Sequence, residues 1–420
     1  MVVNAQKSAC AGYKTIYTEK ITAMSKYTEF DFYDITSMLS EEDVMVRSMV
    51  RKYCSDNLMP LVAKHWEEGT FPSHIAKEMG ALGLLGPGVA AQYGGAAMTA
   101  MQYGLICQEI ERVDSGIRSF SSVQGSLVMY PIEEFGSEEQ KNHYLPKLAS
   151  GEYIGCFGLT EPDFGSDPSG MRTKCVRDGD DWVLNGQKMW ITSGTISDVA
   201  IVWGRDEEGM VQGFIVDCKT PGFSAPEQEH KWSLRCSVTS ELILEDVRVP
   251  EANRLPKATG LKAALSCLTQ ARYGISWGAV GAAQACFDEV LRYTNKRIIH
   301  GRPLSAFQLT QDKLAEMGTE ITKMQLMVWR LAQMKDAGTM RPQHVSMAKR
   351  NNVAKALEIA RICRSLLGAN GITLEYQTGR HMCNLETVLT YEGTHEIHSL
   401  ILGALFIYEK YFARTDAAVN

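Results

Sequence analysis

Apolar residues recur with a helical period through the first third of the chain. The clearest run is spaced i, i+3, i+4 and i+7 and consists of Val46, Met49, Val50 and Tyr53. This spacing places the side chains on one face of a helix. Ser40 followed by Asp43 is typical of a capping box, in which two side chains accept backbone N–H groups of the first turn. We therefore predict a helix that begins after Ser40, within a helical zone that ends near Ser150.

Between Gly151 and Pro250 the helical period gives way to short apolar runs, at residues 182–184, 199–203 and 214–216. Turn-forming pairs punctuate this zone: Asp178-Gly179, Asn185-Gly186, Glu208-Gly209 and Pro221-Gly222. Short apolar runs bounded by turn residues predict strands and hairpins, and the zone has room for about seven strands.

From Gly260 onward the helical period returns. Two apolar stripes stand out, one formed by Val280, Ala283, Phe287, Val290 and Leu291, the other by Val353, Ala356, Leu357 and Ala360. The second helix is expected to end at Gly368, because glycine readily adopts the left-handed conformation that closes many helices. The last zone is therefore predicted to be a helical bundle.

The order helices, strands, helices predicts an α+β chain that is mainly α, because strands and helices do not alternate as a doubly wound fold requires. We predict a disordered extension at 1–30, an N-terminal helical domain at 31–152, a middle β domain at 153–255 and a C-terminal helical domain at 256–420.

Composition narrows the class of protein. The 420 residues are 45% hydrophobic and 22% charged, as in globular proteins of two or three domains. The net charge of −6 and the absence of a basic block argue against nucleic acid as a partner. The apolar stretch 273–287 is too short to span a bilayer, so a soluble protein is expected. Eleven cysteines include no C-x-x-C pair, which fits free thiols in a reducing compartment.

The first 23 residues hold no Arg and no run that suits a secretory signal, and they resemble a mitochondrial presequence only weakly. Either they form a disordered extension or the natural start is Met24.

One segment and two single residues are candidates for ligand binding or catalysis. Residues 157–167 form a predicted strand that runs into a loop rich in Gly, Thr and Ser, which suits either a flat polar ligand or a plain turn. Glu392, before Gly393-Thr394, is on its own more typical of the first turn of a helix. Arg118 lies among small hydroxyl residues that could surround a guanidinium group, although an Arg on a helix is usually solvated. His395-Glu396-Ile397-His398 lacks the spacing of a zinc helix, and no metal is expected.

Four motifs together resemble the acyl-CoA dehydrogenase family. They are residues 157–167, Trp190-Ile191-Thr192, residues 296–301 and Tyr391-Glu392-Gly393-Thr394. The resemblance covers about residues 31–412 and is greatest to the glutaryl-CoA branch, on residues 111–119, 271–275 and 350–352. It implies an N-terminal helical domain, a middle β-barrel domain and a C-terminal four-helix bundle, in agreement with the zones above.

The resemblance implies FAD as the cofactor. The residues that it places at the flavin are Phe157, Leu159, Thr160, Gly165, Ser166, Trp190, Ile191, Thr192, Thr394 and Phe412. Those that it assigns to the adenosine pyrophosphate of a neighbouring subunit's FAD are Arg297, Gln308, Leu366, Leu367, Gly368 and Ala369. The chain would then act as a homo-oligomer, with a tetramer favoured. It departs from the family pattern at His300, usually Phe, and at Ala369, usually Gly, which leaves the packing against FAD open.

The resemblance also implies the reaction. Glu392 would be the catalytic base, since Ala271 occupies the place where other branches carry it. Arg118 would hold the distal carboxylate of glutaryl-CoA. Glu111 lies seven residues earlier, a spacing that would place it beside Arg118 on a helix, where it would compete for the guanidinium group. The substrate-binding set is Arg118, Ser119, Glu111, Ser166, Arg272, Tyr391 and Gly393. The expected products are crotonyl-CoA and CO2, with electrons passed to an electron-transfer flavoprotein.

Three alternatives stay open at this point. They are a short-chain monocarboxylic acyl-CoA dehydrogenase, an acyl-CoA oxidase, and a catalytically idle subunit that binds flavin or CoA. The expected compartment is the cytoplasm in a bacterium, which is favoured, or the mitochondrial matrix in a eukaryote.

Overall fold

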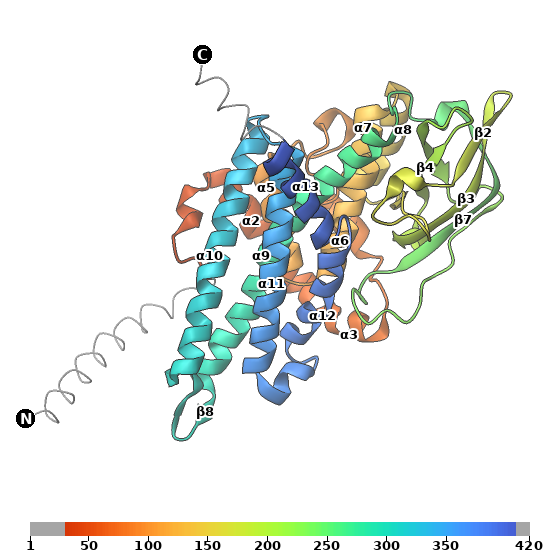
Figure 1. Ribbon diagram of the computed structural model, residues 1–420. Coiled ribbons are helices and arrows are strands. Elements are labelled where there is room, and N and C mark those ends of the chain that lie inside the picture. Colours follow the sequence, from red (N-terminus) through yellow and green to blue (C-terminus); the bar gives the residue numbers. More distant parts are fainter. Residues whose placement is uncertain (1–29, 409–420) are drawn as a thin grey trace, which may run out of the picture.

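Helices occupy one side of the molecule and strands the other in the computed structural model, which describes residues 30–408 (Figure 1). The predicted α+β, mainly α, fold class is confirmed. The predictions about residues 1–29, including Met24, and about Phe412 lie outside the described residues. Phe30 departs from the predicted disordered extension, since its ring packs against Phe287 with 4.8 Å between centroids.

The N-terminal zone is helical, as predicted, and its first long helix begins at the capping box. Ser40 Oγ accepts from the Asp43 N–H (3.1 Å) and Asp43 accepts from the Ser40 N–H (3.1 Å). The α-helices are α2 Glu41–Tyr53, α3 Met59–Glu68, α4 Ile75–Ala81, α5 Ala100–Glu111, α6 Ser115–Ser122, α7 Tyr130–Phe135 and α8 Glu138–Ala149. Short 3-10 turns lie at η1 Ile35–Met38 and η3 Ala91–Tyr93.

Two π-helical segments interrupt this zone, η2 Cys54–Leu58 and η4 Val123–Met129. Each is followed within two residues by a proline, Pro60 or Pro131. Proline has no N–H to donate to the carbonyl four residues earlier, and the wider turn accommodates that loss. In η4, Val123 and Leu127 line a cavity between the sheet and the helices.

The middle zone is a seven-stranded sheet, as predicted. Its strands are β1 Gly155–Gly158, β2 Lys174–Asp178, β3 Asp181–Thr192, β4 Val199–Arg205, β5 Val211–Asp217, β6 Phe223–Ser224 and β7 Thr239–Pro250. The order is β1-β4-β2-β3-β7-β6, with β5 paired to the other edge of β4. Only β1–β4 and β2–β4 pair parallel.

One predicted turn is wrong. Asn185-Gly186 does not separate two strands but lies inside β3, where the register with β7 shifts between Leu184 and Gly186. The pair therefore forms a bulge, the other structure in which a Gly inside a strand pattern is common.

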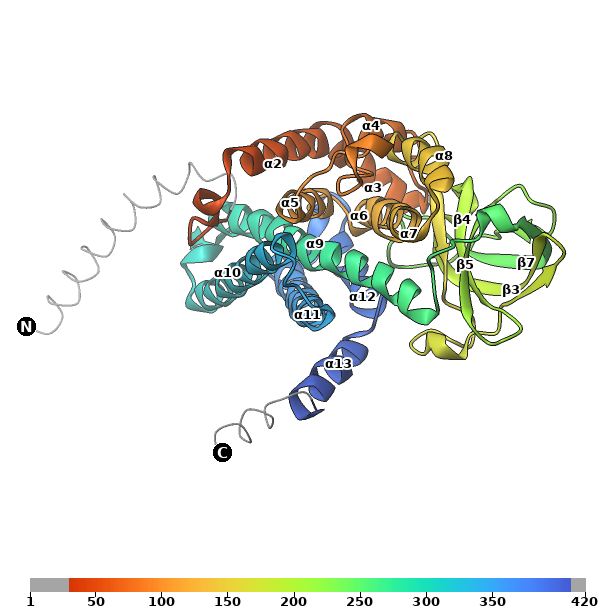
Figure 2. The ribbon, with the colours of Figure 1, turned by 90° about the horizontal axis from the view of Figure 1, so that it is seen from above.

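The C-terminal zone is the predicted helical bundle. Its helices are α9 Leu261–Lys296, α10 Gln308–Asp336, α11 Pro342–Leu366, α12 Gln377–Thr390 and α13 His395–Tyr408, with a small hairpin β8 Ile298–Ile299 and β9 Arg302–Pro303 after α9. The expected stop at Gly368 is confirmed, since its φ is 62°. Seen from above, α9 extends from the sheet to the far end of the bundle (Figure 2). Among the described helices, none has the length and apolar character needed to cross a membrane.

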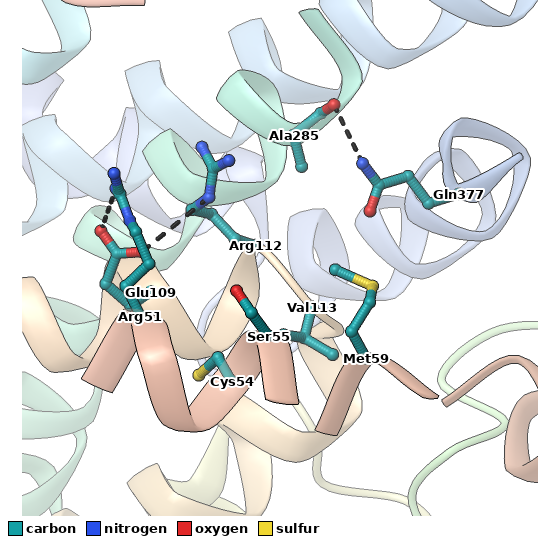
Figure 3. A pocket seen from close by; sticks show the side chains of 9 residues that line it. All are labelled: Arg51, Cys54, Ser55, Met59, Glu109, Arg112, Val113, Ala285 and Gln377. Carbon is teal, nitrogen blue, oxygen red and sulfur yellow. Dashed lines mark hydrogen bonds and ion pairs between the residues drawn. The ribbon is translucent and has the colours of Figure 1, made fainter. Parts of the chain in front are cut away.

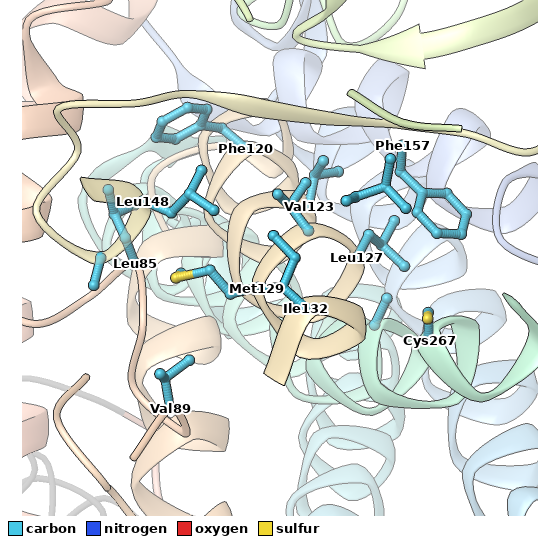
Figure 4. Packing of buried hydrophobic residues seen from close by; sticks show 14 of the residues in the cluster. Leu85, Val89, Phe120, Val123, Leu127, Met129, Ile132, Leu148, Phe157 and Cys267 are labelled. Carbon is cyan, nitrogen blue, oxygen red and sulfur yellow. The ribbon is translucent and has the colours of Figure 1, made fainter. Parts of the chain in front are cut away.

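Two hydrophobic layers hold the site in place. One joins the N-terminal helices to the sheet, where Phe157 meets Val123 and Leu127 of η4 and Cys267 of α9 (Figure 4). The other joins α5 to the bundle through α9. Helices α5 and α9 approach closely at glycines, and a Cβ on Gly278 would lie 1.8 Å from Glu111 Oε2. A side chain at this position would force the carboxylate of Glu111 to move.

Candidate active site

A cavity of about 1580 Å³ lies between the sheet and the helices. Its walls come from the loop after β1, the end of β3, residues 228–234, the start of α9 and the loop between α12 and α13. The sequence-predicted residues on its walls are Phe157, Leu159, Thr160, Gly165, Ser166, Trp190, Ile191, Thr192, Arg272, Tyr391, Glu392, Gly393 and Thr394. The structure thus brings the residues that are expected to contact the flavin and Glu392 to one cavity.

Trp190 lines this cavity at a second shift in register between β3 and β7. The register with β7 shifts between Lys188 and Ile191, and Trp190 has a φ of 62°. The residue stays 62% exposed although its neighbour Ile191 is buried. A large aromatic side chain left open at a cavity mouth is typical of a wall for a flat ligand.

The loop after β1 is fixed by a buried ion pair. Lys188 Nζ donates to Glu161 Oε1 (2.9 Å) and to the Leu159 carbonyl (3.2 Å). Glu161 also accepts from the backbone N–H groups of Arg172 and Thr173. Burial lowers the pKa of Lys188 to about 8, while Lys188 and these donors hold the pKa of Glu161 below its ordinary value against the effect of burial. The loop after β1 is therefore tied to β3 by buried polar contacts.

Glu392 lies in the short loop between α12 and α13, in the left-handed region with a φ of 52°. Its Oε2 is buried and accepts no hydrogen bond. Burial raises the pKa of Glu392 above its ordinary value, while Arg118, Lys349 and Arg272 oppose that rise. A carboxylate with a raised pKa and an open lone pair at a cavity wall is suited to general-base chemistry.

Arg118 is fully buried on α6 (0% exposed). Its Nε donates to Glu111 Oε2 at 2.6 Å, and its Nη2 donates to the Tyr391 hydroxyl. Its Nη1 is buried and has no partner, and the same holds for Glu111 Oε1. Burial raises the pKa of Tyr391, so its hydroxyl stays protonated at neutral pH.

The predicted Glu111–Arg118 contact is present, but the expected geometry is wrong. Glu111 ends α5 and Arg118 belongs to α6, with Asp114 capping the second helix between them. The pair therefore bridges two helices rather than two turns of one. Arg118, Glu111 and Ser119 are buried and do not line the cavity themselves.

The residues expected to serve a neighbouring subunit lie away from the cavity. Arg297 follows α9 and Gln308 begins α10. Leu366 ends α11, and Leu367, Gly368 and Ala369 follow it at the same end of the bundle. Figure 1 shows that end, marked by β8, at the opposite side of the bundle from the sheet. None of these six residues lines the cavity of their own chain.

A second cavity of about 250 Å³ lies among α2, α5, α9 and α12 (Figure 3). Arg51 and Arg112 on its wall are held by Glu109, and Arg112 also contacts Asp288. With its cations paired in this way, the small cavity offers much less to a ligand than the large one.

Sequence reasoning missed one buried charge beside Glu392. Lys349 on α11 is 1% exposed, and its Nζ donates to the carbonyls of Tyr391 and Gly393. A signal was available, because Val345, Lys349 and Val353 are spaced by four and share one helix face. A lysine on the apolar face of a helix is expected to be buried, and a buried lysine needs a hydrogen-bonding or charged partner.

Comparisons with known proteins agree on one family. Models of the acyl-CoA dehydrogenase N-terminal, middle and C-terminal domains match residues 40–152, 156–247 and 258–405. An acyl-CoA dehydrogenase of Bacillus subtilis (strain 168) is 35% identical over 87% of this chain and 97% of its own. The mitochondrial short-chain specific acyl-CoA dehydrogenase of Homo sapiens is 34% identical over 87% of this chain and 90% of its own. A glutaryl-CoA dehydrogenase of Mycobacterium smegmatis, solved in complex with FADH2, is 51% identical over 92% of this chain and 100% of its own, with a TM-score of 0.90.

Proposed function

The chain belongs to the acyl-CoA dehydrogenase family, and from that premise we propose that it oxidises glutaryl-CoA and releases the distal carboxylate as CO2, giving crotonyl-CoA. One observation carries the choice of substrate. Arg118 keeps Nη1 buried and unpaired, while its Nη2 donates to the hydroxyl of Tyr391, which lines the cavity. A buried guanidinium group with a free N–H is suited to binding a carboxylate, whereas the alkyl end of a plain acyl chain offers it no hydrogen-bond acceptor.

The cofactor of this family is FAD, and the cavity fits it. The space is larger than the roughly 300–1,000 Å³ of most ligand pockets, so a flavin and an acyl thioester can lie in it together. A Cβ on Gly165 would meet nothing within 4 Å, which leaves the loop after β1 open to a ligand. Thr160, Ser166 and Thr192 add hydroxyl groups to the same wall. When bound, FAD accepts the hydride that leaves Cβ of the acyl chain.

Glu392 is the proposed base. It faces the cavity with an oxygen that accepts no hydrogen bond, so the α-proton of the thioester can transfer to it. Substrate entry displaces water from the cavity and raises the carboxylate's proton affinity further. The proton stays on Glu392 for the next step.

The carboxylate is lost after oxidation. Breaking its bond to the γ-carbon leaves the electron pair in a dienolate, and Glu392 returns its proton to that carbon to give crotonyl-CoA. Loss of CO2 requires the negative charge to leave the carboxylate, and a strong clamp would oppose this. Glu111 weakens the clamp because it already binds Nε of Arg118. The protonated hydroxyl of Tyr391 can donate to the carboxylate or to the dienolate.

We propose that the chain works as a homo-oligomer, with a tetramer favoured, and passes its electrons to an electron-transfer flavoprotein. The distal end of the bundle supports the first part. Leu309 beside Gln308 is 81% exposed and Ile372 beyond Ala369 is 75% exposed, as expected of a surface that a second subunit covers. Arg297→Ala should lower FAD retention after desalting, whereas Arg292→Ala, on the exposed side of α9, should not.

The test of the proposed substrate is flavin bleaching without oxygen. Glutaryl-CoA should bleach the flavin rapidly and butyryl-CoA slowly. The short-chain relatives make the opposite preference the second candidate, and rapid bleaching by butyryl-CoA alone would establish it. An oxidase would differ by turning over with dioxygen as the sole acceptor, and an idle subunit would bleach with neither thioester.

A further inference from the structure

Lys349 is a buried charge that the mechanism above does not use. It extends from α11 to the back of the loop that carries Glu392 and does not line the cavity. Its Nζ donates to the carbonyl of Tyr391 and, at 2.5 Å, to the carbonyl of Gly393. These two carbonyls flank Glu392 on either side.

The carbonyl between them is held as well. Arg272 Nε donates to the carbonyl of Glu392 at 2.7 Å. Three consecutive carbonyls of the loop are thus turned toward two cations, the buried Lys349 of α11 and the partly buried Arg272 of α9. This backbone requires a φ of 52° at Glu392, which is unfavourable for a residue with a Cβ and persists only where surrounding contacts impose it.

Resting on the proposed role of Glu392 as the base, we propose that Lys349 is a positioning residue for it. Lys349 fixes the carbonyls on both sides of Glu392, and so aims the carboxylate into the cavity. It also places a positive charge behind that carboxylate.

The charges around Glu392 come from every element that packs on its loop. Arg118 extends from α6, Arg272 from α9, Lys349 from α11 and His398 from α13, while Tyr391 belongs to the loop itself. Burial lowers the pKa of His398 to about 3, so it is neutral. Burial also lowers the pKa of Lys349, and the Glu392 carboxylate opposes that change. Removing Lys349 therefore removes a cation that keeps the base ionised.

The test uses Lys349→Met, which keeps an unbranched side chain only one atom shorter and loses both the donors and the charge. We expect bleaching by glutaryl-CoA to slow about 10²-fold, the usual effect of misplacing a reacting group by about 1 Å. The acid limb of the rate profile should move to higher pH. FAD content and the calorimetric Kd for crotonyl-CoA should change less than threefold. Lys349→Gln, which offers amide N–H donors in place of the ammonium group and carries no charge, should show the shifted acid limb with a smaller loss of rate.

Lys355→Met is the matched control, because Lys355 lies on the same helix and pairs with Glu358 at the surface. A purely structural lysine would lower the melting temperature without moving the pH profile. Lys349→Met that bleaches within threefold of the unmodified protein, with its acid limb unmoved, would overturn the proposal. So would loss of FAD from both Lys349 variants, since the lysine would then support the fold as a whole.

Failure of the proposed function has a different signature. If the unmodified protein responds to butyryl-CoA but not to glutaryl-CoA, the substrate is wrong, and the same comparison run with butyryl-CoA still decides the role of Lys349. If no acyl-CoA bleaches the unmodified protein, both proposals fall together.

Discussion

Arg118 and Glu111 form a fully buried ion pair with 2.6 Å between Nε and Oε2, although they stand on different helices. The pair leaves one nitrogen and one oxygen without partners. Burying two charges is costly unless the remaining hydrogen-bonding groups are satisfied. A substrate carboxylate that binds Nη1 would satisfy the nitrogen, which links the pair to substrate choice.

Replacing Arg118 by Gln should damage glutaryl-CoA turnover far more than butyryl-CoA turnover. Truncating one partner of a buried charge pair costs about 2–5 kcal/mol, or roughly 30-fold to several thousand-fold in kcat/KM. The double variant Arg118→Gln, Glu111→Gln separates stability from function, since it leaves no buried charge unpaired. Equal losses on both thioesters, in the single and the double variant alike, would make Arg118 structural.

Gly278→Ala should disturb the Arg118–Glu111 pair without removing either charge. The added Cβ would lie 1.8 Å from Glu111 Oε2 and 3.2 Å from Arg118 Nε, so the carboxylate must move. We expect kcat/KM for glutaryl-CoA to fall at least tenfold more than that for butyryl-CoA. Gly403→Ala on α13 is the control, because its Cβ would meet nothing within 4 Å. Selective loss in the control rather than in Gly278→Ala would contradict this account.

Glu392→Gln should keep the fold and the flavin but abolish bleaching by acyl-CoA. The amide has the shape of the carboxyl group and cannot accept the α-proton. General-base catalysis contributes about 10²–10⁴-fold, so stopped-flow bleaching should slow by at least that factor. A variant that bleached within a few-fold of the unmodified protein would show that another group is the base.

The same variant predicts a pH dependence of stability. The pKa of Glu392 is raised in the folded chain, so the folded state holds this proton more tightly than the unfolded state does. The contribution of Glu392 to stability is therefore fully present below its unfolded pKa and is lost as pH rises through the folded pKa. Glu392→Gln should gain in melting temperature relative to the unmodified protein between about pH 4 and neutrality. A difference that is constant with pH would contradict the raised pKa.

Local signals in the sequence predicted the helical and strand zones, although not every turn within them. The capping box at Ser40 and the apolar period after it fix the start of α2, because both depend on residues within two turns. Asn185-Gly186 misled because the same pair serves a hairpin turn and a bulge, and only the partner strand β7 distinguishes them.

The site was predictable only in part. The family motifs picked out Glu392 and other residues that line one cavity, but Arg272 and Lys349 meet the loop of Glu392 across 120 and 42 residues of sequence. No spacing rule connects such distant positions. The break between α5 and α6 was missed for a related reason, since Asp114 at the break is also held by Arg380 of α12.

The most direct test of the central claim is the product of one turnover. The protein with its FAD is mixed with one equivalent of glutaryl-CoA without oxygen, and thioesters and CO2 are measured against the flavin reduced. We predict crotonyl-CoA and CO2, each in an amount equal to the reduced flavin. Glutaconyl-CoA without CO2 would contradict the decarboxylation, and a flavin left oxidised would contradict glutaryl-CoA as the substrate.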